Sequence, residues 1–231
     1  ANNGSSILYA SVHRAAYKFF YGNRLGLKRP ALPYGKTKIG VYNRNPWWGS
    51  GCCWGTWSLL GIIPDIRVAH SHTTPTSEVF ATAIHELGHQ SHLLFIGKGT
   101  YIQLAKEIHE SWATAVQWKL TNHHYNEEQE QDLYTYYYNC QEWFPGNKGK
   151  GKTSCYTPIF IDLMDYFNQR KSGSQYPNDL IGGYEISYIQ NKILSSSYGL
   201  SSLKDALKSN KINGVTNNQI DELMAKYWGQ H

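Results

Sequence analysis

Residues 80–95 carry the feature that most constrains the fold of this chain, the stretch FATAIHELGHQSHLLF. Apolar side chains occupy most sides of a helix drawn through it, so such a helix must be buried by the rest of the chain. Thr74 fits an N-cap, Pro75 fits the first helical position, and Glu78 places a negative charge in the first turn. The sequence therefore predicts a long buried helix that begins near residue 75.

A second helix is expected after a short turn. Gly97 and Gly99 are typical of a helix end, and helical spacing resumes over residues 100–121. Its expected core face consists of Ile102, Ala105, Ile108, Trp112, Val116 and Leu120. Together the two segments predict an antiparallel pair of helices.

The segments around this helix pair predict an α+β fold. Residues 37–43 and 65–72 alternate apolar and polar side chains like strands, and we expect 65–72 to lie close to a sheet edge. Residues 5–21 have helical spacing. Further helices are expected over residues 127–139, 156–171, 183–196, 200–210 and 217–228. We therefore expect one domain, with a small mixed sheet and the buried helix in about residues 1–97 and a mainly helical part in about residues 100–231.

The composition excludes several classes of protein. Hydrophobic residues make up 41% of the 231 residues and charged residues 17%, which favours a globular chain with a core. A net charge of +5 is mild at this length, and no Lys/Arg run predicts nucleic-acid binding. No window approaches the ~18 apolar residues of a membrane span. The chain does not begin with Met, so we expect that a leader has been removed or that the chain belongs to a longer protein.

Four cysteines favour an oxidising compartment, which is periplasmic, cell-surface or extracellular. Cys140 and Cys155 bracket a polar, Gly-rich loop, and a disulfide bond there would contribute ~3 kcal/mol. Cys52 and Cys53 are adjacent, so they form either a strained bridge with each other or bonds with different partners. The sequence leaves all three pairings open, and four reduced thiols are the alternative.

The motif His85-Glu86-x-x-His89 lies inside the buried helix. Residues four apart on a helix share one face, so both imidazoles can reach one ion at the ~2.0–2.1 Å that zinc prefers. Glu86 lies ~100° further round the helix, where a general base is needed. A chance H-E-x-x-H is expected roughly 0.02 times in such a chain. The alternative, two solvated histidines, conflicts with the apolar neighbours, because buried imidazoles need partners.

A catalytic zinc site needs a third protein ligand. The candidates are His92, Glu107, His109 and Glu110. His89 and Glu110 lie at nearly equal distances along the chain from Gly99, so they should face each other in the helix pair. We expect Glu110 to be the ligand, with Glu107 as the alternative. His92 is expected to support the site or to face the substrate.

These motifs resemble those of the gluzincin metallopeptidases, in the thermolysin-like and enhancin-like branch. HELGH at 85–89, HESWATA at 109–115 and the preceding strand at 65–72 carry the resemblance, which covers about residues 65–120. It implies a zincin-like fold in which residues 65–72 form the edge strand that aligns an extended substrate. The thermolysin-like pattern E-x-x-x-D is broken, because Thr114 stands in place of the Asp that supports a histidine ligand.

The resemblance implies a zinc peptidase that acts on proteins or glycoproteins. Zn²⁺ would be bound by His85, His89 and Glu110, and Glu86 would serve as the general base. We expect a secreted or cell-surface endopeptidase and a monomer. An aminopeptidase is less favoured, because no Gly-rich exopeptidase motif accompanies the site.

The residue that stabilises the oxyanion is harder to assign among eighteen tyrosines. The resemblance implies a Tyr or His from the C-terminal part. Tyr184 follows a Gly pair that would let it approach a cleft, and Tyr156 beside Cys155 is the alternative. For any single tyrosine, packing in the core with the hydroxyl pointing outward is the simpler interpretation.

A second hypothesis is a binding module in which the same fold recognises carbohydrate or protein with little catalysis. The Trp-rich residues 47–57 and the Tyr-rich residues 134–138 motivate it, because exposed aromatic rings stack on sugars. Packing in the core or in loops is the alternative role for these rings.

Overall fold

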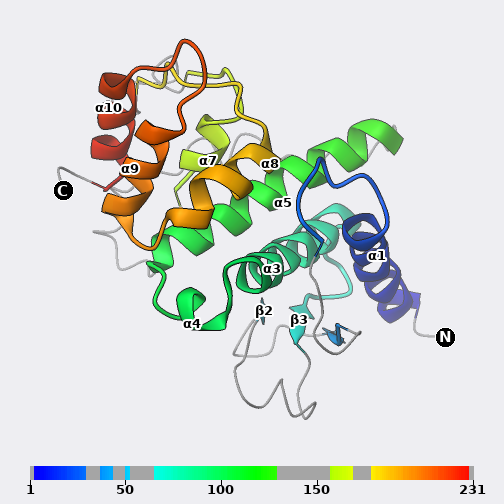
Figure 1. Cartoon of the computed structure of the whole chain (residues 1–231). Helices are drawn as coiled ribbons and strands as arrows, with labels where there is room; N and C mark the ends of the chain where they lie inside the picture. The colour runs from blue at the N-terminus through cyan, green and yellow to red at the C-terminus, as the bar shows by residue number, and fades with distance from the viewer. Residues whose placement is uncertain are drawn as a thin grey trace. The chain divides into compact units, whose positions relative to one another are not determined.

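Figure 1 shows the computed structural model of the whole chain. It describes residues 3–29, 37–43, 50–52, 65–128, 157–168 and 178–228. Within these residues the fold is α+β and mostly helical, with a small three-stranded mixed sheet. The predicted fold class is confirmed at this level, and its zincin-like character stays a prediction.

The chain divides into two compact units. Unit 1 comprises residues 1–98 and 116–134, and unit 2 comprises residues 99–115 and 135–231. The helix α5 (Lys106–Glu128) therefore contributes its first part to unit 2 and its remainder to unit 1. The chain thus returns to unit 1 within α5. The predicted single domain, with parts of about residues 1–97 and 100–231, stays a prediction.

Unit 1 is built around the long helix α3. Its elements are α1 (Asn3–Phe20), β1 (Ile39–Tyr42), β2 (Gly51–Cys52), β3 (Ile66–Ala69) and α3 (Thr76–Ile96). The helices α1 and α3 pack against each other, and α3 also packs on β3. The helix predicted over 5–21 and the strands predicted over 37–43 and 65–72 are confirmed.

The strand β3 is the middle strand of the described sheet, so its predicted place at an edge is wrong. The order is β1-β3-β2, with β1 parallel and β2 antiparallel to β3. Ile66 pairs with Ile39 on one side and with Cys52 on the other. Alternation identifies a strand but not its neighbours, which come from distant parts of the chain. Within this sheet, residues 65–72 cannot be the edge strand that the resemblance implied.

The ends of α3 differ slightly from the prediction. Pro75 occupies the N-cap position with φ −53° and ψ 141°, and no side chain caps the helix. Thr74, the predicted N-cap, lies one residue too early. Glu78 lies in the first turn as predicted. At the other end, Gly97 has φ 84° and donates its N–H to the Leu93 carbonyl, which confirms the predicted stop.

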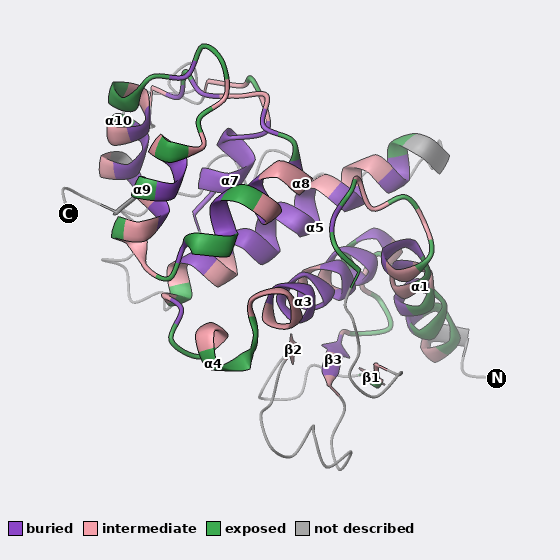
Figure 2. Cartoon of the chain, in the orientation of Figure 1, coloured by how far each residue is buried: buried purple, intermediate pink, exposed green. Residues whose placement is uncertain are grey.

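The interior of α3 is buried on most sides, as its apolar sequence predicts. Its fully buried apolar residues are Val79, Phe80, Ala81, Ala83, Ile84 and Leu87. Figure 2 shows the helix as largely buried. Burial therefore extends over the turns that carry the HELGH motif.

The predicted second helix begins later than expected. The short helix α4 (Lys98–Tyr101) follows α3, and α5 starts only at Lys106. Ile102, assigned to the core face, is 72% exposed. The Ala105 N–H bonds to the Tyr198 carbonyl at 3.4 Å, so this residue is engaged outside a helix. The rest of the predicted face is confirmed, with Ile108, Trp112, Val116 and Leu120 buried.

The described part of unit 2 beyond α5 is helical, as predicted. It contains α7 (Ile159–Asp162), α8 (Ile186–Tyr188), the π-helical η3 (Ile189–Ile193), the 3₁₀ turn η4 (Leu194–Ser196), α9 (Leu200–Ser209) and α10 (Asn217–Trp228). The helix predicted over 156–171 is reduced to α7. The Asp165 side chain accepts the N–H of Phe167 and so competes with helix continuation. Residues 129–139 lie outside the described residues.

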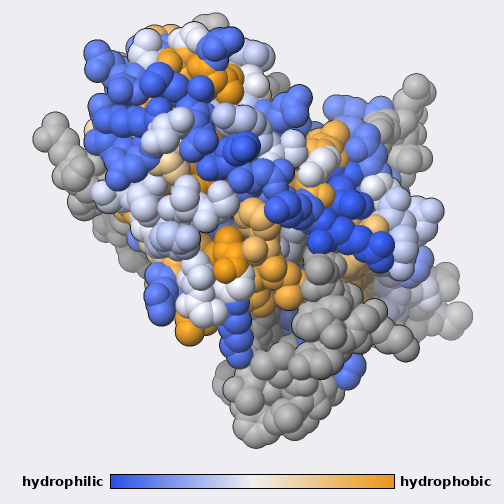
Figure 3. All heavy atoms as spheres, viewed as in Figure 1, coloured by the Kyte–Doolittle hydropathy of each residue, from blue (hydrophilic) through white to orange (hydrophobic). Residues whose placement is uncertain are grey.

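Hydrophilic side chains cover most of the described surface in the view of Figure 3, with hydrophobic ones in smaller groups. None of the helices in the described ranges is long and apolar enough to cross a membrane.

Candidate metal centre

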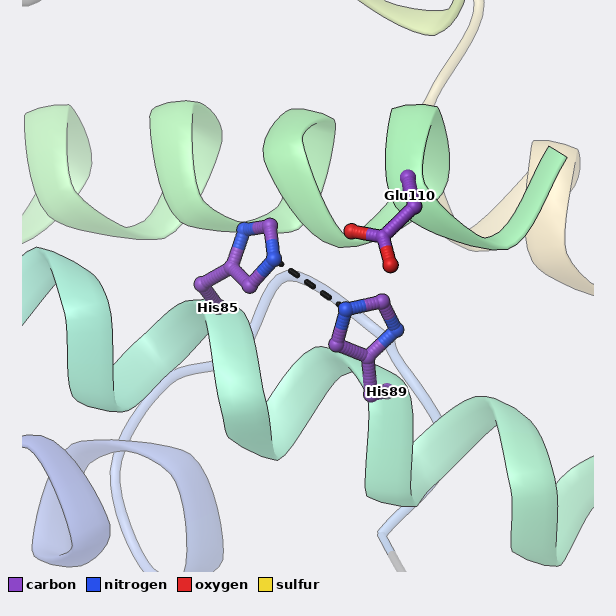
Figure 4. A group of neighbouring side chains, drawn as sticks. All are labelled: His85, His89 and Glu110. Carbon is purple, nitrogen blue, oxygen red and sulfur yellow. Dashed lines mark hydrogen bonds between the residues drawn. The ribbon is translucent and has the colours of Figure 1, made fainter. Parts of the chain in front are cut away.

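His85 and His89 lie one turn apart on α3 and project from the same face (Figure 4). Their Nε2 atoms are 3.1 Å apart. Since this face belongs to a buried helix, the His89 side chain is only 7% exposed. The i, i+4 spacing therefore brings the two imidazole nitrogens to one point.

Glu110 lies on α5 and directs its carboxylate toward both histidines (Figure 4). One nitrogen from each imidazole and one carboxylate oxygen of Glu110 all lie within 4.8 Å of one another. The group can therefore hold a metal ion, and the prediction that Glu110 faces the histidine pair is confirmed.

The donor set fits zinc chemistry. Two imidazoles and one carboxylate are ligands that catalytic zinc sites use, with a further position left open for water or substrate. In a tetrahedral site with bonds of ~2.0–2.1 Å, two nitrogen ligands are about 3.3 Å apart. The 3.1 Å between the two Nε2 atoms is close to this value. The three side chains could therefore hold a metal ion.

Gln117 was missed by the sequence analysis. Its Oε1 lies 3.0 Å from Nδ1 of His85, and the residue is 8% exposed. Gln117 follows Glu110 by seven residues, which is two helical turns, so both lie on the face of α5 that meets α3. Spacing along the chain does not point to Gln117, because His85 lies one turn before His89 and its opposite residue would be expected one turn after Glu110, at Thr114.

The other ligand candidates are not part of the metal-binding group among the described residues. His92 is completely buried, and its predicted role, to support the site or to face the substrate, stays a prediction. Nδ1 of His109 lies 3.7 Å from Oε1 of Glu110, and its ring lies tilted against the Tyr101 ring, with 5.3 Å between centroids and 38° between planes. His109 therefore neighbours the ligand Glu110. Glu107 lies one turn earlier on α5, outside the group.

Glu86 is buried on α3 beside the two histidines, with 6% of the residue exposed. Because Glu86 directly follows His85 on the helix, its side chain points about 100° away from that of His85 around the helix axis. Its role as general base stays a prediction.

Tyr184 lies in unit 2, where it is 3% exposed. Its hydroxyl accepts the N–H of Ile212 at 3.3 Å, and burial raises the pKa of this hydroxyl. These contacts are those of a packed tyrosine, which was the simpler interpretation of any tyrosine here. Its role in oxyanion stabilisation stays a prediction, and Tyr156 lies outside the described residues.

The Gly pair before Tyr184 has a local packing role. A Cβ on Gly182 would lie 2.0 Å from the Asp165 carbonyl oxygen, and one on Gly183 would lie 2.3 Å from the Tyr166 hydroxyl. Gly183 also has φ 85°. The two glycines therefore allow close approach to residues 165–166.

Several predicted features cannot be placed. The tryptophans within residues 47–57 and the Tyr-rich residues 134–138 lie outside the described residues. Cys52 lies in β2, whereas Cys53, Cys140 and Cys155 lie outside the described ranges. The disulfide pairing therefore stays open.

No known protein-family model, curated protein or solved structure matches this chain. The resemblance to gluzincins thus rests on the sequence motifs alone, and membership of that group stays a prediction.

Proposed function

We propose that this protein is a zinc-dependent peptidase, acting as an endopeptidase on proteins or glycoproteins. One observation carries the proposal: nitrogen atoms of His85 and His89 and an oxygen atom of Glu110 converge within 4.8 Å. Two ligands from one helix and one from the next leave a coordination position for water or substrate, as catalytic zinc sites require.

In this proposal the chain's own residues bind the metal and move a proton. A bound Zn²⁺ would polarise the scissile carbonyl and make a water molecule more acidic. His85, His89 and Glu110 would hold the ion. Glu86 takes one proton from the attacking water and delivers it to the leaving amine, while the oxygen of that water bonds to the carbonyl carbon. The peptide bond is replaced by a carboxylic acid and an amine, so atoms and charges balance.

The four cysteines favour an oxidising location, and we propose a secreted, periplasmic or cell-surface protein. The net charge of +5 is too mild to suggest nucleic acid as a partner. A monomer remains our expectation.

The first prediction concerns Glu86→Gln. This change keeps the size of the side chain and removes the base, so we expect zinc content to persist and hydrolysis to fall by several orders of magnitude. The measurement combines metal content with cleavage of a mixed peptide and glycoprotein library, with and without chelator. Glu78→Gln, the same change at an exposed position of α3, should leave both readouts unchanged.

Unchanged turnover in Glu86→Gln, or turnover that resists the chelator, would contradict a metallopeptidase. A wild-type protein that holds zinc but cleaves nothing would favour the binding module instead. Glycan binding by Glu86→Gln, lost when Trp47 and Trp48 are replaced, would then identify its ligand class.

A further inference from the structure

The hydrogen bond between His85 and Gln117 determines which nitrogen of His85 carries a proton. Oε1 of Gln117 lies 3.0 Å from Nδ1 of His85. An amide oxygen can only accept, so Nδ1 must donate, and a neutral imidazole then has a free lone pair on Nε2. That lone pair is on the atom that faces His89 at 3.1 Å. The Gln117 contact therefore presents the metal-binding nitrogen of His85 in the required protonation state.

The same logic extends to His89 in the metal-free protein. Because Nε2 of His85 is an acceptor, Nε2 of His89 must donate across the 3.1 Å contact. A chain of hydrogen bonds thus runs from His89 through His85 to Gln117. Metal binding would displace one proton from this chain, the proton on Nε2 of His89, and would leave the His85–Gln117 hydrogen bond intact.

The structure of unit 1 holds Gln117 in place. The residue is 8% exposed, and it lies between the buried Val116 and Trp118. Seven residues further along α5, the His124 ring stacks on Phe80 of α3 with centroids 4.5 Å apart and planes 12° apart. These contacts lie within unit 1, so they fix the register of this part of α5 against α3.

The uncharged amide also has a consequence for the metal. Gln117, which is hydrogen-bonded to His85, is uncharged. Glu110 is then the one anionic ligand in the group, so a divalent ion bound there together with its ligands would keep a net positive charge. A carboxylate in the place of the Gln117 amide would add a negative charge near the metal. It would also make the His85 imidazole a stronger electron-pair donor to the metal. We propose that Gln117 is a positioning residue that holds His85 in its Nδ1–H tautomer and sets a metal affinity below that of a carboxylate-supported site. The inference rests on the metal centre of the proposed function but not on hydrolysis.

The first test measures Zn²⁺ affinity by competition with a chromogenic chelator. Gln117→Met keeps the length of the side chain and removes the acceptor, so we expect affinity to fall by about 10–100-fold. Gln117→Glu keeps the acceptor and adds charge, so we expect an affinity above that of the wild type. The matched control is Gln90→Met. Gln90 is buried like Gln117, but it lies on α3 and its Oε1 accepts a hydrogen bond from the Thr37 hydroxyl and not from His85. It should bind Zn²⁺ like the wild type.

The second test reads the tautomer directly, by ¹⁵N chemical shifts of the His85 imidazole in the metal-free protein. We expect Nδ1–H in the wild type, a mixture of tautomers in Gln117→Met, and Nδ1–H again in Gln117→Glu. A purely structural role for Gln117 would not move these signals.

Two results would overturn the inference. One is wild-type Zn²⁺ affinity in folded Gln117→Met, and the other is a wild-type His85 protonated on Nε2, which would mean that the Gln117 amide nitrogen faces the ring. If Gln117→Met does not fold, Gln117→Glu decides, and an affinity no higher than that of the wild type counts against the inference. Neither readout involves cleavage, so failure here and failure of the peptidase proposal are distinguishable.

Discussion

At the residue scale, Glu107 and Glu110 show how finely helix geometry selects a ligand. Both are glutamates in the first turns of α5, three residues apart. Only a rotation of ~60° separates their directions on the helix. Glu110 brings an oxygen within 4.8 Å of both imidazoles, whereas Glu107 is not in that group. The identity of the ligand is therefore set by register between α3 and α5 and not by residue type.

A second prediction follows for these two glutamates. Glu110→Gln removes the anionic ligand, so we expect zinc affinity to fall by about 100-fold or more. Glu107→Gln makes the same chemical change outside the group and should bind zinc like the wild type. Titration calorimetry on the metal-free proteins measures both. Weak binding in Glu107→Gln together with normal binding in Glu110→Gln would reverse the assignment.

At the element scale, local chemistry predicted more than long-range pairing. The buried helix α3, its acidic first turn and its stop at Gly97 could be predicted, because propensity, burial and caps all lie within one segment. The start of α5 and the central position of β3 could not. Both depend on partners far along the chain, Tyr198 for Ala105 and Gly51–Cys52 for β3.

The metal centre follows the same division. The spacing of His85 and His89 is local and was predictable, and the helix pair led to Glu110 although its turn was placed too early. Gln117 lies 32 residues from His85 in sequence. Whether Gln117 faces His85 depends on how α5 is rotated about its own axis. The sequence predicted too early a start for this helix and therefore did not define that rotation.

The glycine that ends α3 supports a third prediction. Gly97 has φ 84° and ψ 149°, a backbone conformation that side chains strongly disfavour, and an added Cβ would meet nothing within 4 Å. Gly97→Ala should therefore lower the free energy of unfolding by about 1–3 kcal/mol through backbone strain alone. Gly99 has equal space for a Cβ but lacks the positive φ, so Gly99→Ala should cost nothing. Urea unfolding measures both, and equal stability of the two variants would contradict the argument.

At the scale of the whole molecule, the described part of unit 2 contains a buried acid that opposes folding at neutral pH. Asp179 is 4% exposed, and its Oδ1 accepts the N–H of Ile181 at 3.0 Å. Burial raises the pKa of Asp179 to about 8, the Ile181 hydrogen bond lowers it in part, and the neighbouring Asp165 adds a further upward shift. The folded protein therefore keeps a proton that the unfolded chain releases near pH 4.

This protonation difference gives the fourth prediction. Between about pH 4 and pH 8 the unfolded state binds fewer protons than the folded state, so stability should fall as pH rises and level off above pH 8. Asp179→Asn keeps the acceptor for Ile181 and removes the acid, so it should flatten this slope and raise stability at pH 8, on the order of 2 kcal/mol. Urea unfolding at a series of pH values measures it. Asp205→Asn, at an exposed position of α9, is the control, and an unchanged slope in Asp179→Asn would refute the prediction.

The division of α5 between the two compact units has a consequence for biosynthesis. A ribosome delivers the chain from its N-terminus, and most domains can fold as soon as their last residue emerges. Here the first ninety-eight residues cannot complete their unit alone, since the segment from Val116 onward must arrive to cover them. The nascent HELGH helix therefore has to wait, with its apolar sides uncovered, until α5 has left the exit tunnel. A chaperone that shields that intermediate should raise the yield of the folded protein.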